Sequence, residues 1–227
     1  MNRPAAIVNR FTRILASDPL RGANLFAPLP GPILGWSNLT HWIFFNAILG
    51  QCPEIKSVLI CGVYRGLDLS LMTDAAKQNN RTIRLVGVDL FSDQPCADWP
   101  EELRGKTWEE AQSFPPPSME AAREACPTAE IIQSNSIDYL KQHASEFDFI
   151  YLDTSHDYQT VHDEITAILS QQNRPEQSRS AAASKGPLLA GDDYAAIAGH
   201  DWGVERACNE LLPAHLALFH RLWISDL

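Results

Sequence analysis

Three aspartates stand at the ends of two short apolar runs in the second half of the chain. Asp153 ends the run 147–153, and Asp192 and Asp193 follow the run 187–191. If both runs are parallel strands, their carboxyl ends meet at one edge of a sheet and the carboxylates converge. Mg²⁺ takes oxygen ligands and keeps some of its waters, so this group predicts a magnesium site. The alternative is that these acids only cap a turn or position a loop.

Two histidines are expected on the same rim. His156 follows the first of these strand ends and His200 the second. Imidazole exchanges a proton near neutral pH, so either could act as general base toward a substrate hydroxyl. A hydroxyl bound to a metal also loses its proton more readily. The sequence therefore predicts a site that can turn a hydroxyl group into a nucleophile.

A glycine turn follows an earlier apolar run. Gly62 and Gly66 frame three residues directly after the run 57–61, and helical spacing resumes from there to Asn79. Glycine permits a tight turn and close backbone approach, and the following helix offers free N–H groups to an anion or carboxylate. The Gly-x-x-x-Gly spacing differs from the Gly-x-Gly-x-x-Gly of dinucleotide turns, which disfavours a dinucleotide without excluding it. A purely structural turn is the alternative.

Asp89 ends the next apolar run, about 20 residues beyond the glycine turn. An acid at this place accepts hydrogen bonds from ribose hydroxyls in nucleoside-binding sheets. A helix N-cap or a solvated loop acid is the alternative. Its position behind the buried run 85–88 favours a ribose contact.

Apolar runs and helical stretches alternate along the chain, which is typical of a parallel sheet covered by helices. Strands are expected at 57–61, 83–90, 130–133, 147–153 and 187–191, with one or two closing strands in 216–224. Helices are expected from Ser37 or Asn38 to about Leu49 and at 67–79, 136–143, 161–171 and 203–212. The sequence thus predicts an α/β fold, a doubly wound, mostly parallel sheet with helices on both faces.

The domain organisation expected is an N-terminal helical arm and helix over residues 1–50, followed by one domain over 51–227. The stretch 92–127, with its proline run, falls outside the alternation and predicts a lid-like insert, and 173–185 predicts a flexible one. The apolar residues of the arm could pack on its own domain or on a second copy, so a homo-oligomer is possible.

The composition of the chain indicates which class of binding partner to expect. The 227 residues carry a formal net charge of -10 and are 45% hydrophobic. An acidic surface does not attract nucleic-acid backbones or anionic membranes, and no apolar run has membrane length, so a small-molecule partner is expected. The five cysteines are scattered without a Cys-x-x-Cys pair, which predicts reduced thiols and a cytoplasmic location.

Taken together, these motifs resemble class I S-adenosylmethionine (SAM)-dependent methyltransferases. More narrowly, the chain resembles the bacterial group of macrocin-type sugar O-methyltransferases and proteins named after cephalosporin hydroxylase. The likeness covers about residues 58–212. It is carried by the segments 58–66 (VLICGVYRG), 86–91 (VGVDLF), 147–158 (FDFIYLDTSHDY), 191–194 (GDDY) and 203–211 (GVERACNEL).

This resemblance implies a Rossmann-like, seven-stranded sheet whose last strand is antiparallel. It places the methionine part of SAM against residues 62–66, the ribose on Asp89 and the adenine near 134–136. The cofactor-binding residues it implies are Cys61, Gly62, Tyr64, Gly66, Asp89, Leu90, Asn135, Ser136 and Asp153. The metal ligands it implies are Asp153, Asp192 and Asp193, with His156 and Tyr158 on the adjoining substrate loop.

The activity expected is metal-assisted O-methylation of a sugar, a catechol-like compound or a natural product, with His156 or His200 as the base. Cys61 and Ser155 depart from the pattern of this group. These two departures keep open the alternative that the chain is a non-catalytic SAM-binding protein. A further alternative is another nucleotide-cofactor enzyme, such as a dehydrogenase, in which Asp89 would bind the ribose equally well.

Overall fold

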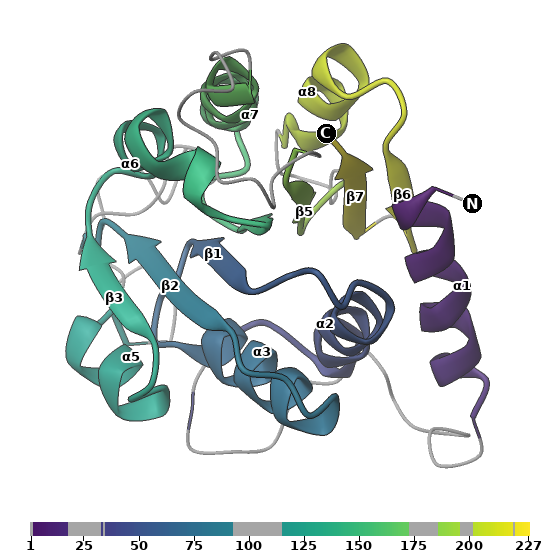
Figure 1. The fold of residues 1–227 in the computed structure, drawn as a ribbon. Coiled ribbons are helices and arrows are strands. Elements are labelled where there is room, and N and C mark those ends of the chain that lie inside the picture. Colours follow the sequence, from purple (N-terminus) through teal and green to yellow (C-terminus); the bar gives the residue numbers. More distant parts are fainter. Residues whose placement is uncertain are drawn as a thin grey trace.

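The computed structural model describes residues 2–17, 33, 35–92, 115–172, 186–195, 202–219 and 221–227. These residues contain a seven-stranded sheet in the order β3-β2-β1-β4-β5-β7-β6 (Figure 1). The strands are β1 (Ser57–Cys61), β2 (Arg84–Asp89), β3 (Glu130–Gln133), β4 (Phe149–Leu152), β5 (Leu188–Gly191), β6 (Leu216–Leu218) and β7 (Leu222–Asp226). β1 to β5 pair in parallel, and β7 runs antiparallel to β5 and β6. The expected mostly parallel sheet with an antiparallel last strand is confirmed.

Helices cover both faces of this sheet, as expected for a doubly wound fold (Figure 1). One face packs against α1 (Arg3–Leu15), α2 (Leu39–Gln51), α3 (Leu67–Gln78) and α5 (Met119–Ala125). The other packs against α6 (Ser136–His143), α7 (Tyr158–Gln172) and α8 (Val204–Leu211), with the short 3-10 helix η3 (Ala144–Glu146) following α6.

Strand β1 shows why the apolar runs are continuous rather than alternating. Val58 and Ile60 are buried in the core beside α2 and α3, whereas Leu59 and Cys61 are buried in the core beside α6 and α7. Because both faces of a doubly wound sheet are covered, the four buried side chains of this central strand, from Val58 to Cys61, are all apolar. Full burial of one such aliphatic side chain contributes about 1.5–3 kcal/mol.

The N-terminal helix packs on its own chain. Asn2 caps α1 by accepting a hydrogen bond from the Ala5 amide at 3.0 Å. Ile7 and Phe11 are fully buried, and the Phe11 ring lies edge-on to Phe44 of α2 at 6.2 Å. The apolar side of α1 is therefore covered by α2 and by the β6 and β7 edge of the sheet (Figure 1).

The stretch expected to be a lid-like insert contains a regular element. Residues 119–125 form α5, which Ser118 caps by accepting from the Ala121 amide at 3.2 Å, and α5 packs beside α3 and β3. The end of the stretch is thus the ordinary connecting helix between β2 and β3. Its earlier part, 93–114, with Trp99 and Trp108, lies outside the described residues, as does the expected insert 173–185.

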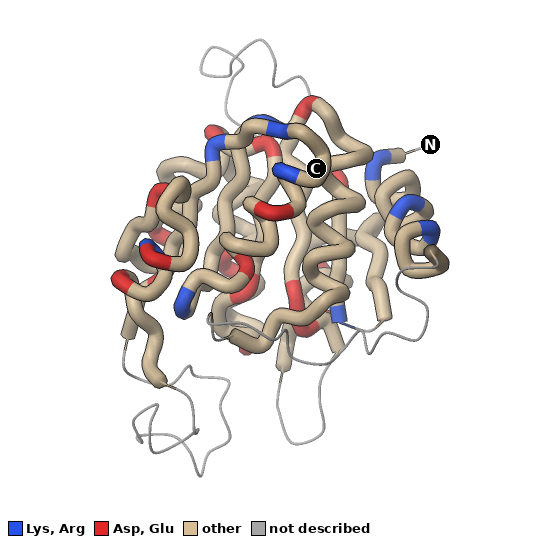
Figure 2. The backbone as a smooth tube through the Cα atoms, turned by 90° about the horizontal axis from the view of Figure 1, so that it is seen from below, with Lys and Arg blue, Asp and Glu red and all other residues tan. Residues whose placement is uncertain are grey.

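Charged residues of both signs are spread over the described elements (Figure 2). Three arginines lie on α1 at one side of the molecule, and the other basic positions stand among acidic ones (Figure 2). Among the described helices, none is both long and apolar enough to cross a membrane.

Candidate active site

The glycine turn after β1 adopts a backbone that requires glycine. Gly62 and Gly66 have φ of 89° and 93°, and Tyr64 between them also lies in the left-handed region at 53°. A Cβ on Gly62 would overlap the backbone carbonyl of Asp153, at the end of β4. Gly66 is the N-cap of α3 and provides no side chain to its first amides. The turn is therefore pressed against β4 and leaves the start of α3 uncapped by any side chain.

Asp89 ties this turn to the end of β2. One oxygen of its carboxylate accepts from the amides of Val63 at 2.7 Å and Tyr64 at 2.8 Å, and the other accepts from the Phe91 amide at 2.7 Å. Leu90, the next residue, is 53% exposed at the same strand end. The alternative of a helix N-cap does not apply, because no helix of the described residues starts here.

The end of β3 leads into α6 through Asn135, which caps this helix by accepting from the Asp138 amide at 3.2 Å. Ser136 follows and is buried against Glu164 of α7. Glu164 is fully buried and accepts a hydrogen bond from Thr154 Oγ1 at 2.8 Å. Burial raises the pKa of Glu164 to about 7, against the opposing effect of hydrogen bonds with Ser136 and Thr154. Glu164 thus links the segment after β3, through Ser136, to the loop after β4, through Thr154.

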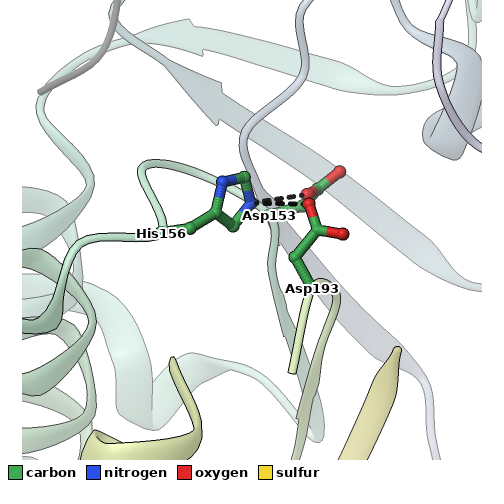
Figure 3. A group of neighbouring side chains, drawn as sticks. All are labelled: Asp153, His156 and Asp193. Atoms are coloured by element: carbon green, nitrogen blue, oxygen red, sulfur yellow. Dashed lines mark ion pairs between the residues drawn. The ribbon is translucent and has the colours of Figure 1, made fainter. Parts of the chain in front are cut away.

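Asp153, His156 and Asp193 form a group at the tips of β4 and β5 (Figure 3). His156 Nε2 lies 3.5 Å from Asp153 Oδ1 and 3.2 Å from Asp193 Oδ2, so the imidazole faces both carboxylates. One ligand atom from each residue lies within 4.8 Å of the others. Burial, followed by repulsion from Asp192, raises the pKa of Asp193 to about 7. The sequence predicted this meeting of strand ends.

Asp192 does not join that group, contrary to the ligand set implied by the resemblance. It is 4% exposed, and its carboxylate accepts from His41 Nε2 at 2.9 Å and from Arg221 Nε and Nη2, both at 3.1 Å. Burial alone would raise the pKa of Asp192, but attraction by His41 and Arg221 lowers it well below its usual range. The structure turns Asp192 inward and places His156 beside the other two acids.

Cys61 contributes its backbone but not its side chain to this region. Its carbonyl accepts from the Asp153 amide at 2.8 Å. Its thiol is fully buried in the core beside α6 and α7, and burial raises the pKa of the thiol well above its usual value. A cofactor contact by the Cys61 side chain is therefore not supported. His200, the other candidate base, lies outside the described residues.

Two further groups, Asp68 and Trp36, lie near the site. Asp68, in the first turn of α3, is 6% exposed, and burial followed by repulsion from Asp153 raises its pKa to about 7. Trp36 precedes α2, is 43% exposed and lies with its ring centroid 4.8 Å from that of Tyr64. The position of Asp68, two residues after Gly66, predicts either a role at the start of α3 or a ligand contact. No local pattern marks Trp36.

Comparisons with known proteins show the family and the fold of this chain. A family model described as a methyltransferase domain matches residues 59–174. No curated protein matches the sequence. Among solved structures, the SAH-bound methyltransferase PaMTH1 of Podospora anserina is similar with a TM-score of 0.51 and 14% identity, over 99% of this chain and 88% of that one.

Two other solved structures show weaker likeness. Cofactor-bound Rv0187 from MTB gives a TM-score of 0.47 and 15% identity, over 100% of this chain and 97% of that one. Spermidine synthase of Thermotoga maritima gives 0.42 and 15%, over 77% of this chain and 53% of that one. With the family model matching half of its length, the chain belongs to the methyltransferase domain family, as a class I SAM-dependent methyltransferase.

Proposed function

We propose that this protein transfers the methyl group of SAM to a hydroxyl oxygen of a small molecule, with a divalent cation bound beside the cofactor. The observation that carries the proposal is that Asp153 contacts the glycine turn with its backbone and belongs to the acidic group with its side chain. Its backbone is pressed against Gly62 of the glycine turn, and its carboxylate faces His156 beside Asp193. A cofactor at the turn and an acceptor at the acidic group would thus be neighbours.

The cofactor would lie along the ends of β1, β2 and β3. The turn formed by Gly62, Tyr64 and Gly66 would receive its methionine part, because the uncapped start of α3 offers N–H groups to a carboxylate. Asp89 and Leu90 would border the ribose, and Asn135 and Ser136 the adenine. The similar Podospora structure is SAH-bound, which supports SAM as the cofactor.

The possible ligand atoms of the acidic group suit a divalent cation. Mg²⁺ is commonly held by one or two carboxylates and keeps its remaining waters, and Asp153 and Asp193 provide two carboxylates at one point. Burial, followed by repulsion from Asp192, raises the pKa of Asp193, and a bound cation would favour its ionised form. Such a cation, when bound, would make a neighbouring hydroxyl more acidic.

His156 would accept the proton of the acceptor hydroxyl. Its Nε2 faces two carboxylates, which stabilise the positively charged imidazolium. In the reaction the hydroxyl oxygen forms a bond to the methyl carbon while the bond from carbon to sulfur breaks. The sulfonium becomes the neutral thioether of SAH, and the hydroxyl proton goes to His156. The protein's main contribution is to hold the oxygen in line with the methyl group.

The first test is isothermal titration with SAM and SAH, with and without Mg²⁺ and with NADH as control. Micromolar binding of SAM and SAH, about -8 kcal/mol, is expected. NADH binding in their place would favour a dehydrogenase.

The second test is methyl transfer to a panel of sugars and catechols, assayed with Mg²⁺ and with EDTA. Loss of transfer with EDTA and in Asp193→Ala is expected, with His156→Gln impaired and His162→Gln, on α7, serving as the matched control. Full transfer in EDTA and in Asp193→Ala would remove the metal from the mechanism. SAM binding without transfer to any acceptor would favour the non-catalytic alternative.

A further inference from the structure

A buried ion network lies directly behind the proposed acceptor site. Asp192 is at its centre, with His41 Nε2 at 2.9 Å from Oδ2 and Arg221 Nε at 3.1 Å from Oδ1. Arg221 Nη2 also lies 3.1 Å from Asp192 Oδ2 and 3.9 Å from Asp193 Oδ1. Both oxygens of Asp192 are therefore engaged, and the network reaches the neighbouring acid.

The His41 end of the network is fixed by the start of α2. His41 is fully buried, and the Asn38 amide meets its Nδ1 at 3.0 Å as part of a capping box. Nε2 points the other way, at Asp192, whose pKa is held low, so that its carboxylate can only accept. Nε2 therefore carries a proton toward Asp192 whatever the state of Nδ1. One ring nitrogen of the imidazole thus contacts the cap of α2, and the other contacts the tip of β5.

The β5 tip needs such support because its backbone is strained. Asp193 has φ of 50°, in the left-handed region that non-glycine residues rarely adopt. The residue before it is held by His41 and Arg221, and the amide of Tyr194 after it donates to the Arg221 carbonyl at 2.8 Å. A strained residue persists when both of its neighbours are held.

We propose that His41 is a positioning residue that acts through Asp192 to hold Asp193 against His156. Asp192 is then a support of the site rather than a metal ligand, and a helix outside the β4 and β5 loops determines the geometry of the acceptor site. The role of Asp193 in cation binding rests on the proposed function, whereas the support of the strand tip does not.

The test uses two substitutions of His41, each of which keeps the polar contact of one ring nitrogen and removes that of the other. Glutamine places an amide N–H near the position of Nε2, so His41→Gln keeps the donor to Asp192. Asparagine places its polar atoms near Nδ1, so His41→Asn keeps the polar contact with the cap and loses Asp192. His143→Asn, at an exposed histidine paired with Glu146, is the control for the substitution itself.

The first readout is amide hydrogen exchange over residues 191–195, without metal. We expect exchange at least tenfold faster in His41→Asn and close to wild type in His41→Gln and in the control. Unchanged exchange in His41→Asn would overturn the proposal. Equal acceleration in both His41 variants would also overturn it, because the imidazole would then act only as packing.

The second readout is Mn²⁺ binding by electron paramagnetic resonance. At least tenfold weaker binding is expected in His41→Asn, with recovery in His41→Gln and unchanged SAH affinity in both. Wild-type protein that binds no Mn²⁺ would contradict the proposed metal role, while the exchange result still decides the role of His41.

Discussion

Gly62 and Asp153 are in direct backbone contact, so that the turn after β1 and the tip of β4 form one unit. The Gly62 amide donates to the Val88 carbonyl at 2.9 Å, and the Asp153 amide donates to the Cys61 carbonyl at 2.8 Å. No space remains for a Cβ at Gly62. The cofactor side and the acceptor side of the proposed site are therefore joined by main chain.

This contact predicts different outcomes for alanine at the two glycines of the turn. Gly62→Ala and Gly66→Ala each place an L-residue in the left-handed region, at a cost of about 1–2 kcal/mol. Only the methyl group of Gly62→Ala overlaps the Asp153 carbonyl, whereas that of Gly66→Ala would lie 3.0 Å from Ala122 Cα. We expect SAH affinity at least tenfold weaker in Gly62→Ala than in Gly66→Ala, measured by titration calorimetry. Equal affinities would show that the contact does not shape the cofactor site.

A substitution at Cys61 should affect stability without affecting the cofactor. The thiol faces the core beside α6 and α7, so Cys61→Ala removes buried volume there and leaves the turn in place. We expect a loss of about 1 kcal/mol in the free energy of unfolding by urea. SAH affinity should stay within twofold. A tenfold loss of affinity in a folded Cys61→Ala protein would assign the side chain a cofactor role after all.

The succession of strands along the chain and the residues at their ends could be predicted from the sequence. Continuous apolar runs mark covered strands, and parallel strands bring their carboxyl ends to one edge. The orientation of each side chain could not be predicted in the same way. Asp192 and Asp193 are neighbours of identical chemistry, and Asp192 turns inward because His41, 151 positions away, and Arg221 pair with it. Such a choice depends on tertiary contacts that no local pattern contains.

The same limit applies to Asp89 and to α5. The sequence predicts Asp89 at a strand end, but its hydrogen bonds to the amides of the glycine turn depend on how the turn folds back. Helix α5 is only seven residues long and follows a proline run, so helical periodicity is too short to recognise.

Substitution of the two adjacent acids should change folding stability to very different extents. Asp192→Asn removes the charge that balances buried His41 and half-buried Arg221, and breaking a buried pair such as Asp192 with His41 costs about 3–5 kcal/mol. Asp193→Asn removes a charge that burial and Asp192 already disfavour, so stability should change by less than about 1 kcal/mol. Urea unfolding at neutral pH measures both. On the proposed function, Asp193→Asn also loses Mg²⁺ binding by calorimetry. Greater destabilisation by Asp193→Asn would reverse the roles assigned to the two residues.

Glu164 predicts a pH dependence of folding stability. Burial raises its pKa from the ordinary value of 4.5 to about 7. Between these values the folded protein binds the proton that the unfolded chain has lost, so this contribution to the free energy of unfolding falls as pH rises and levels off above pH 7. At 1.36 kcal/mol per pKa unit, the full effect is about 3 kcal/mol.

Glu164→Gln keeps an acceptor for Thr154 and removes the ionisation. The variant should therefore be more stable than wild type at pH 8, with the difference shrinking toward pH 5, as measured by urea unfolding at both values. Glu146→Gln is the matched control, because hydrogen bonding from His143 lowers the pKa of this exposed acid and predicts a small effect of the opposite sign. A pH profile of Glu164→Gln that runs parallel to wild type would mean that folding does not raise the pKa of Glu164.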